Sequence, residues 1–379
     1  MKVLILYEIS HQVVLMDSLC ENLNKIGIDA ESFDTSLLRL YSPKRHKKSF
    51  WLWLYKKSQK LPRGRGFIER HFYYRLILQL SKGYDIIDVQ SLFNSMYSFL
   101  VPKFKENKKK VKVHIWGSDF YMNVPEWVRW QVKVYERTDI IQIATKQMAG
   151  DFIKRFPEYK NKIRSGVFGN QHLDDLLDFK KHPEKTDLSF IKGDFKGKIV
   201  VTCGYNARSR HQHLKIIEAL NRLPQEQQDK LFVVFPMTYL REKKYIQKVN
   251  QSLENVHFAY FMINEYMSEE QLKSLRMFTD LYINIIESDA LSSSTQEHLF
   301  CGNVVLVGDW LPYSVFEENG VFYLKTSLDQ LQNNIDYAIT NLNELKKKSS
   351  DNPNNLYNIC SWSSAIPRFE KIYNEMLSM

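Results

Sequence analysis

Long apolar runs and paired cysteines are both missing from this sequence. No stretch approaches the length of about 18 uncharged apolar residues that a bilayer-spanning helix needs, so no membrane-spanning helix is predicted. The four cysteines, Cys20, Cys203, Cys301 and Cys360, form no CxxC pair, and none has a histidine at the interval of a metal site. The sequence therefore predicts neither a disulfide framework nor a zinc site, and a reducing cytoplasm fits it best.

Glycine and proline are also scarce, with 14 and 11 residues in a chain of 379. Together with a hydrophobic content of 44%, this composition argues against extensive disorder. One hydrophobic core rarely serves a chain of this length, so we expect two domains of roughly 150 to 190 residues with a cleft between them. The apolar start MKVLILY is soon followed by polar residues and has no small-residue cleavage site, so we expect a first strand there rather than a signal peptide.

Short apolar runs rich in β-branched residues alternate with amphipathic stretches along both halves of the chain. This alternation is typical of parallel sheets covered by helices, and it predicts an α/β protein with two Rossmann-like domains. The expected strands are 3–7, 28–33, 85–89, 111–116 and 140–144, then 199–203, 231–235, 256–260, 281–285 and 304–307. The expected helices of the first half are 11–26, 67–80, 125–137 and 146–156.

Composition also suggests where the domains end. The stretch around 181–197 is charged, contains Gly and lacks periodicity, so it is predicted to be a hinge-like linker. The predicted parts are an N-terminal domain over 1–180, this linker, a C-terminal domain over 198–360, and a helix over 361–379 that crosses back to the first domain. That helix carries an apolar stripe of Ile366, Phe369, Ile372, Tyr373 and Met376.

Positive charge is concentrated in one segment, residues 39–75. It holds twelve Lys or Arg against one acid, a net charge of +11, whereas the whole chain carries +10. Aromatic residues are interleaved with these cations, which favours an anionic membrane surface or, alternatively, RNA. A third interpretation is an exposed arm with its aromatic rings turned into the core. The residues expected to touch a membrane are Lys47, Lys48, Trp51, Trp53, Lys56 and Lys57.

The most informative stretch is residues 285–310, IIESDALSSSTQEHLFCGNVVLVGDW. It is predicted to leave a strand, pass through a polar loop and open a helix, which is where α/β sheets bind phosphorylated ligands. The hydroxyl groups of Ser292, Ser293 and Ser294 add donors. Two alternatives involve no ligand: Ser294 and Glu297 are spaced as a helix capping box, and Asp289 can cap a loop. A metal-binding triplet at Glu287–Asp289 is a further alternative.

This stretch resembles the segment of retaining GT-B glycosyltransferases in which two acids stand seven residues apart. The resemblance implies that Glu297 binds the ribose of a nucleotide, that Asp289 lies by the donor sugar, and that amides of Leu291–Ser293 meet the diphosphate. It departs from the family pattern in having Asp as the first acid and Asn303 in place of proline. The implied ligand is a nucleoside diphosphate sugar, UDP or dTDP, bound as substrate, with no cofactor or metal.

A second part of the resemblance is VTCGYNARSRHQHLKIIEAL, residues 201–220. Here similar enzymes place a glycine loop and cations against the donor phosphates. Gly204 would form the turn, and Arg208 and Arg210 would bind phosphate through their planar forks, with Asn206 behind them. A solvated basic turn is the alternative.

The motif HIWGSDFY, residues 114–121, is the third part. Together with the Gly204 loop and VVFPMTY, residues 233–239, it is similar to bacterial transferases of 4-acetamido-4,6-dideoxygalactose (Fuc4NAc) in enterobacterial common antigen synthesis. Related GT-B enzymes place a sugar-contacting histidine where this sequence has Trp116. Asp119 is predicted to act as an acceptor base or to hold Tyr121, and His114 is either catalytic or a buried strand histidine.

The predicted function is a metal-independent, retaining glycosyltransferase of bacterial surface polysaccharide (O-antigen or capsule) synthesis. Its acceptor is predicted to be a glycan or a polyprenyl-diphosphate-linked sugar at the inner face of the cell membrane, where the cytoplasmic enzyme binds peripherally. No nucleic-acid partner is expected. The rival hypotheses are a GT-B-like sugar-nucleotide epimerase or hydrolase and a basic nucleic-acid-binding protein.

Overall fold

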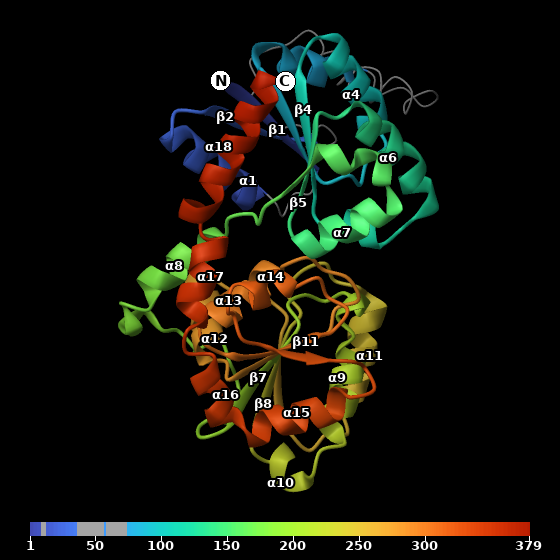
Figure 1. The fold of residues 1–379 in the computed structure, drawn as a ribbon. Coiled ribbons are helices and arrows are strands. Elements are labelled where there is room, and N and C mark those ends of the chain that lie inside the picture. The colour runs from blue at the N-terminus through green and yellow to red at the C-terminus, as the bar shows by residue number, and fades with distance from the viewer. Residues whose placement is uncertain (9–12, 36–56, 58–73) are drawn as a thin grey trace. The chain divides into compact units, whose positions relative to one another are not determined.

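The computed structural model describes residues 1–8, 13–35, 57 and 74–379, and their contacts divide the chain into two compact units. Unit 1 comprises Met1–Gly169 and Ala365–Met379, and unit 2 comprises Asn170–Ser364. In the described residues each unit has one six-stranded sheet, and its helices lie on both sides of that sheet (Figure 1). Every neighbouring pair of strands is parallel. The chain therefore has the two predicted Rossmann-like α/β domains.

The sheet of unit 1 has the strand order β2-β1-β3-β4-β5-β6. Its strands are β1 (Lys2–Tyr7), β2 (Asp29–Asp34), β3 (Ile86–Gln90), β4 (Lys110–Ile115), β5 (Ile140–Ile143) and β6 (Ile163–Ser165). Its α-helices are α1 (Val13–Lys25), α4 (Tyr97–Glu106), α5 (Ser118–Tyr121), α6 (Pro125–Arg137) and α7 (Lys146–Arg155). All five residues of β3 are buried, as expected for a central parallel strand with both faces covered.

The C-terminal helix α18 (Trp362–Ser378) completes unit 1, since its residues from Ala365 onward belong to that unit. All five residues of the predicted apolar stripe are buried. The helix also reaches a polar group in the interior: the Tyr373 hydroxyl donates to Asp88 Oδ2 at 2.7 Å. Lys112 Nζ lies 2.9 Å from the same oxygen, and neither charged side chain is exposed. A fully buried ion pair therefore anchors α18.

The sheet of unit 2 has the strand order β12-β11-β10-β7-β8-β9. Its strands are β7 (Ile199–Cys203), β8 (Leu231–Pro236), β9 (Ala259–Ile263), β10 (Leu281–Asn284), β11 (Val304–Gly308) and β12 (Leu324–Thr326). Its helices are α8 (Gln171–Phe179), α9 (His213–Asn221), α10 (Gln225–Gln228), α11 (Lys243–Leu253), α12 (Glu269–Phe278), α13 (Ser293–Phe300), α14 (Ser314–Glu318), α15 (Leu331–Thr340), α16 (Leu342–Lys348) and α17 (Asn352–Cys360).

Alternation along the strands of unit 2 produces two hydrophobic layers. Val201 and Val233 point to one face, where they pack with residues of α9, α11, α15 and α16. Val200 and Val234 point to the other face, where they pack with Leu275 of α12. Successive side chains of a strand point to opposite faces of the sheet. Because helices cover both faces of this sheet, side chains of both orientations need to be apolar, and the strands are apolar runs without alternation.

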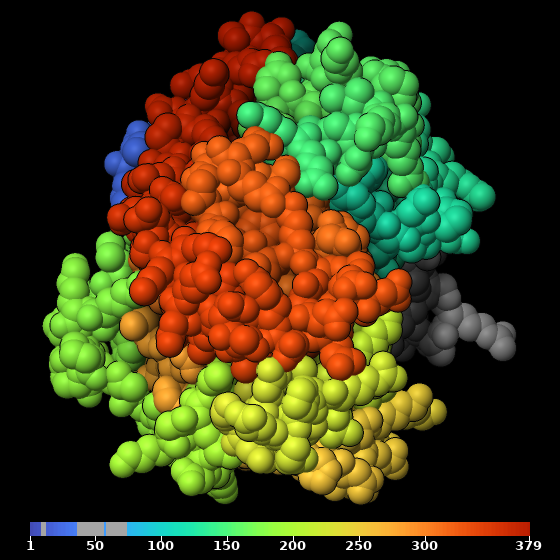
Figure 2. Space-filling model, turned by 60° about the horizontal axis from the view of Figure 1, so that its bottom comes forward, coloured from blue at the N-terminus to red at the C-terminus, as the bar shows by residue number. Residues whose placement is uncertain are grey.

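The segment predicted as a linker, 181–197, belongs to unit 2 instead. Ile191 is buried in the layer beneath α12, with Leu188 and Phe195 packed beside it. The Asp187 backbone N–H also donates to Ser274 Oγ of α12 at 2.9 Å. In the space-filling view this light-green region lies on one flank of unit 2 (Figure 2). The units divide at Gly169 and Asn170. The boundary differs from the prediction because four apolar residues of the segment, Leu188, Phe190, Ile191 and Phe195, pack in this hydrophobic layer of unit 2.

Three strands also differ from the prediction. Strand β9 begins at Ala259 and not at 256, and the edge strands β6 and β12, of three residues each, were not predicted. In the described part of the chain, no helix has the length and apolar character needed to cross a bilayer.

Candidate functional site

The strand order of unit 2 has a topological switch point between β7 and β10. These strands are neighbours, but the chain continues from β7 toward β8 and β9 on one side and from β10 toward β11 and β12 on the other. Ligands of open α/β sheets bind at the loops that follow the strands at such a point. We call these two loops, residues 204–212 and 285–292, the switch-point loops. They contain most of the residues predicted to bind the donor.

Hydrogen bonds join the switch-point loops to each other. Glu287 N donates to the Arg210 carbonyl at 3.0 Å, and the Arg210 guanidinium donates to the Ser288 carbonyl at 3.3 Å. The Gln212 side chain donates to the Ile285 carbonyl at 2.5 Å. Arg210 Nε also lies 3.7 Å from the Glu287 carboxylate. Arg210 therefore connects the loops, a role that the phosphate prediction did not include.

Gly204 makes the turn at the end of β7. Its φ of +65° is in the region that favours glycine, and an added Cβ would lie 2.8 Å from His213 Nε2 and 3.1 Å from His211 Nδ1. Both imidazoles are buried, and burial lowers the pKa of His213 to about 4 and that of His211 well below its ordinary value. The glycine thus brings the backbone against two neutral rings, where no larger residue fits without a shift.

Arg208 and Asn206 occupy the outer part of the first loop. Buried Asn206 accepts a hydrogen bond from the Arg208 backbone N–H at 3.0 Å, which fixes the turn. The Arg208 side chain is exposed, and its guanidinium makes no hydrogen bond or ion pair with the residues that the structure describes. Of the two predicted phosphate ligands, Arg208 is therefore the one whose donors are available.

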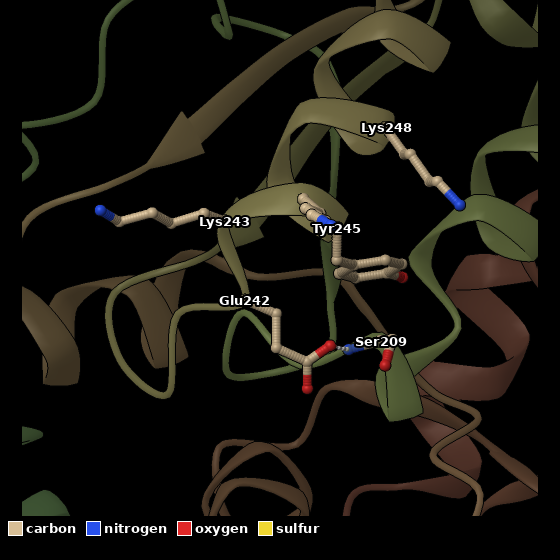
Figure 3. A pocket seen from close by; sticks show the side chains of 6 residues that line it. Ser209, Glu242, Lys243, Tyr245 and Lys248 are labelled. Carbon is tan, nitrogen blue, oxygen red and sulfur yellow. Dashed lines mark hydrogen bonds between the residues drawn. The ribbon is translucent and has the colours of Figure 1, made fainter.

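A hollow of about 450 Å³ lies beside this loop (Figure 3). Its lining residues are Ser209, Glu242, Lys243, Lys244, Tyr245 and Lys248. The Glu242 carboxylate accepts from Ser209 N at 3.2 Å, while Lys243 extends away from it. The lining of this hollow thus contains three lysines and one acid, and its net positive charge favours an anionic ligand.

The second loop ends at the N-terminus of α13. Ser292 is the N-cap and its hydroxyl accepts from Thr295 N at 3.3 Å, while the first backbone bond of the helix runs from Gln296 N to the Ser292 carbonyl at 3.1 Å. The N–H groups of Ser293 and Ser294 come earlier in the helix, and neither of these two bonds uses them. They are the donors that a helix N-terminus offers to an anion.

Asp289 lies in the same loop with its carboxylate held by several donors. Tyr313 OH donates to Oδ2 at 2.8 Å, and Ala290 N donates to Oδ1 at 2.7 Å. Burial raises the pKa of Asp289 above its ordinary value, although hydrogen bonds from Tyr313, Ser292 and Ala290 favour the ionised form. Tyr205 and Tyr239 lie within electrostatic reach of this carboxylate. Sequence reasoning gave none of these three tyrosines a role, and Tyr313 lies outside the motifs that it singled out.

Glu297 is neither in a capping box with Ser294 nor exposed. Its Oε2 accepts from Arg276 Nε of α12 at 2.8 Å, and the two side chains are only 5% and 6% exposed. Burial alone would raise the pKa of Glu297, but the charge of Arg276, with a smaller contribution from His172, outweighs it and the pKa lies below its ordinary value. The capping-box alternative is wrong because Ser292, two residues earlier, caps the helix.

The HIWGSDFY motif has a structural role in unit 1. Asp119 is 2% exposed, and it accepts from the backbone N–H groups of Trp116, Gly117 and Leu92 at 2.9, 3.0 and 3.0 Å. Burial raises its pKa to about 6 despite these donors. Asp119 does not hold Tyr121, whose hydroxyl donates to Asp151 at 3.0 Å. The predicted acceptor base therefore organises the loop after β4, with both carboxylate oxygens occupied.

His114 is likewise enclosed. It is 1% exposed, its ring stacks on Trp116 with centroids 5.0 Å apart, and neither ring nitrogen has a hydrogen-bond partner among the described residues. Burial, reinforced by the charge of Lys112, holds its pKa well below the ordinary value. Of the two interpretations of His114, the structure favours the buried strand histidine over a catalytic group.

The predicted membrane-binding residues fall largely outside the described residues. Lys47, Lys48, Trp51, Trp53 and Lys56 are not described, and Lys57 is described only as an exposed residue. Their role stays a prediction.

Solved structures share this two-unit architecture. Anabaena Alr3699/HepE in complex with UDP matches with a TM-score of 0.66 at 13% identity, over 99% of this chain and 100% of that one. A glycosyltransferase from Rickettsia africae matches with a TM-score of 0.70 at 15% identity, over 99% and 98%. Sucrose-phosphate synthase from Thermosynechococcus elongatus matches with a TM-score of 0.71 at 11% identity, over 100% and 99%.

The chain has the GT-B fold. No protein-family model matches the sequence, and no curated protein matches it at a significant level. The GT-B fold confirms the predicted fold class, and within it the switch-point loops lie at the carboxyl edge of the C-terminal sheet.

Proposed function

We propose that this GT-B chain is a glycosyltransferase that moves a sugar from a nucleoside diphosphate sugar to an acceptor hydroxyl. The observation that carries the proposal is that the two switch-point loops, one with Gly204 and Arg208 and the other with Asp289, are hydrogen-bonded to each other, and that the second leads into α13. A diphosphate needs donors and positive charge, and a sugar needs acceptors for its hydroxyl groups. The switch-point loops supply both over a short span of chain.

The diphosphate would bind between the N–H groups of Ser293 and Ser294 and the guanidinium of Arg208. These groups would also stabilise the charge that develops on the leaving nucleotide, which is a large term in catalysis of this kind. Asp289 would accept from the sugar, and Glu297, held by Arg276, would accept from the ribose as the family resemblance implies. The positive charge comes from the protein itself, so we infer a reaction without metal, and the resemblance of residues 285–310 implies retention at the anomeric carbon.

The proposed donor is a UDP- or dTDP-sugar. The Anabaena protein has been solved with UDP-glucose, and the trehalose-phosphate synthase of Burkholderia xenovorans with glucose-6-phosphate. Here the proposed acceptor is a glycan or a polyprenyl-diphosphate-linked sugar of bacterial surface polysaccharide synthesis, as in the Fuc4NAc transferases that the sequence resembles. The +11 segment 39–75 supports peripheral binding at the inner face of the cell membrane.

Calorimetric titration of the full chain with UDP-, dTDP- and GDP-sugars tests the central proposal. Arg208→Ala removes an exposed cation without breaking a contact among the described residues, so we expect affinity for the preferred nucleotide sugar to fall about 10- to 100-fold. Arg222→Ala, an exposed arginine at the far end of α9, is the matched control and should leave affinity unchanged. If the wild type binds none of these nucleotides, the proposal fails.

Membrane binding has its own test. Co-sedimentation with liposomes should recover the protein with vesicles that contain anionic lipid and leave it in solution with neutral vesicles, because the attraction is electrostatic. Equal recovery with both kinds of vesicle would refute this part of the proposal.

A further inference from the structure

Tyr313 lies in the loop between β11 and α14, next to the second switch-point loop. Strand β11 is the neighbour of β10, so the loops that follow the two strands run side by side. Trp310 joins them, since its indole N–H donates to the Ile286 carbonyl at 2.9 Å. This tryptophan packs so closely on Gly308 that an added Cβ there would lie 2.4 Å from the ring. The loop that carries Tyr313 is therefore fixed against the loop that carries Asp289.

The hydroxyl group of Tyr313 donates to the Asp289 carboxylate at 2.8 Å, and the Ser292 side chain also hydrogen-bonds to this carboxylate. The ring is 1% exposed, and the Tyr323 hydroxyl donates to the Tyr313 carbonyl at 3.2 Å, so the residue has little freedom. Burial, together with the nearby carboxylate, raises the pKa of Tyr313 well above its ordinary value, which keeps the phenol protonated and able to donate.

Tyr313 and Ala290 together fix the orientation of the Asp289 carboxylate, because one donates to Oδ2 and the other to Oδ1. The hydroxyl and the backbone N–H of Ser292, the N-cap of α13, also hydrogen-bond to this carboxylate. Asp289 therefore lies beside the N-terminus of α13. A ligand that binds at both places would carry an anionic group and hydroxyl groups close together.

We propose that Tyr313 is a positioning residue for the donor sugar. By donating to Oδ2 it orients the Asp289 carboxylate toward the hydroxyl groups of a sugar whose diphosphate lies at the N-terminus of α13. The assignment rests on the proposed nucleotide-sugar function. It adds a residue outside the motifs that resemble the family, and this residue affects binding of the sugar but not binding of the nucleotide.

The test compares the dissociation constants of a nucleotide sugar and of the free nucleotide. The ligand pair is whichever of UDP-glucose with UDP, dTDP-glucose with dTDP, or GDP-mannose with GDP binds the wild type most tightly. Tyr313→Phe should weaken binding of the nucleotide sugar about tenfold, the effect of losing about 1.4 kcal/mol of interaction, and change binding of the free nucleotide less than twofold. The matched control is Tyr357→Phe, which removes a tyrosine–aspartate hydrogen bond to Asp174 elsewhere in unit 2 and should change neither.

Asp289→Asn provides the second variant, because asparagine keeps an oxygen for the Tyr313 hydroxyl. We expect it to give the same selective loss, and the double variant to lose no more than Asp289→Asn alone. Equal weakening of the sugar and the free nucleotide, or additive losses in the double variant, would overturn the assignment. A wild type that binds no nucleotide would instead overturn the proposed function, so the two failures are distinct.

Discussion

The buried Arg276–Glu297 pair allows a quantitative prediction about unit 2. Arg276 of α12 and Glu297 of α13 approach to 2.8 Å with side chains 6% and 5% exposed. Replacing Arg276 by methionine keeps most of the side-chain volume and leaves the Glu297 carboxylate buried without its cation. Removal of one partner of a buried pair typically costs about 3 to 5 kcal/mol. For a unit of this size, that corresponds to a fall in melting temperature of about 6 to 20 °C.

The pH dependence of this loss has a definite sign. In the wild type the pKa of folded Glu297 lies below its ordinary value of 4.5, so the pair stabilises above that value and the contribution is lost as the pH falls through the folded pKa. Without Arg276, burial is opposed only by the smaller contribution of His172 and should raise the folded pKa of Glu297 above the ordinary value. The variant should then be most destabilised at neutral pH, and its deficit relative to the wild type should shrink as acid protonates Glu297.

Calorimetric melting over a series of pH values measures this, and hydrogen exchange locates the change in α12 and α13. The control is Arg222→Met, which breaks the exposed pair with Glu218 and should cost no more than about 0.5 kcal/mol. The double variant Arg276→Met with Glu297→Gln should recover much of the loss, because no buried charge remains. An Arg276→Met protein within 1 kcal/mol of the wild type at neutral pH, or with a deficit that does not shrink in acid, would refute the reasoning.

Three further substitutions have expected outcomes. Gly204→Ala places a Cβ 2.8 Å from His213 Nε2 at a φ of +65°. Thermal melting should therefore show that the free energy of unfolding falls by about 1 to 2 kcal/mol or more, and titration should show weaker binding of the nucleotide. Asp119→Asn replaces one of the two oxygens that accept from backbone N–H groups by an NH2 group, which donates. Urea unfolding should show that the free energy of unfolding falls by about 1 to 3 kcal/mol. Unchanged stability would contradict the loop-organising role of Asp119. Tyr373→Phe removes the donor to buried Asp88, so hydrogen exchange should accelerate in α18 and the strands beneath it while unit 2 stays unchanged.

Much of the fold follows from the sequence because its central strands are continuous apolar runs. Strands β7 and β10 and helix α6 lie within one residue of their predicted bounds, since their patterns are long or bordered by charged residues. Strands β6 and β12, of three residues at sheet edges, have too little buried surface to leave a pattern. The segment 181–197 has the composition of a charged linker, but a few of its apolar residues, such as Ile191, pack in a hydrophobic layer of unit 2.

The candidate site divides along similar lines. Gly204 and Ser292 could be predicted because a strand end and a helix start impose local requirements on those residues. Tyr313 and Arg276 could not, because their partners are 24 and 21 residues away and only the strand order brings them together. Asp119 is the opposite case: an acid in a conspicuous motif is occupied by backbone N–H groups, two from its own loop and one from Leu92.

The anchoring of α18 on the Asp88–Lys112 pair has a consequence for biosynthesis. Residues from Ala365 onward leave the ribosome only after all of unit 2 has been made, yet Tyr373 is the hydroxyl donor to Asp88 in the interior of unit 1. The first unit to be synthesised is thus the last to be completed. While unit 2 can fold as soon as it emerges, the nascent N-terminal sheet must wait with a charged pair at its centre until the helix that covers it arrives.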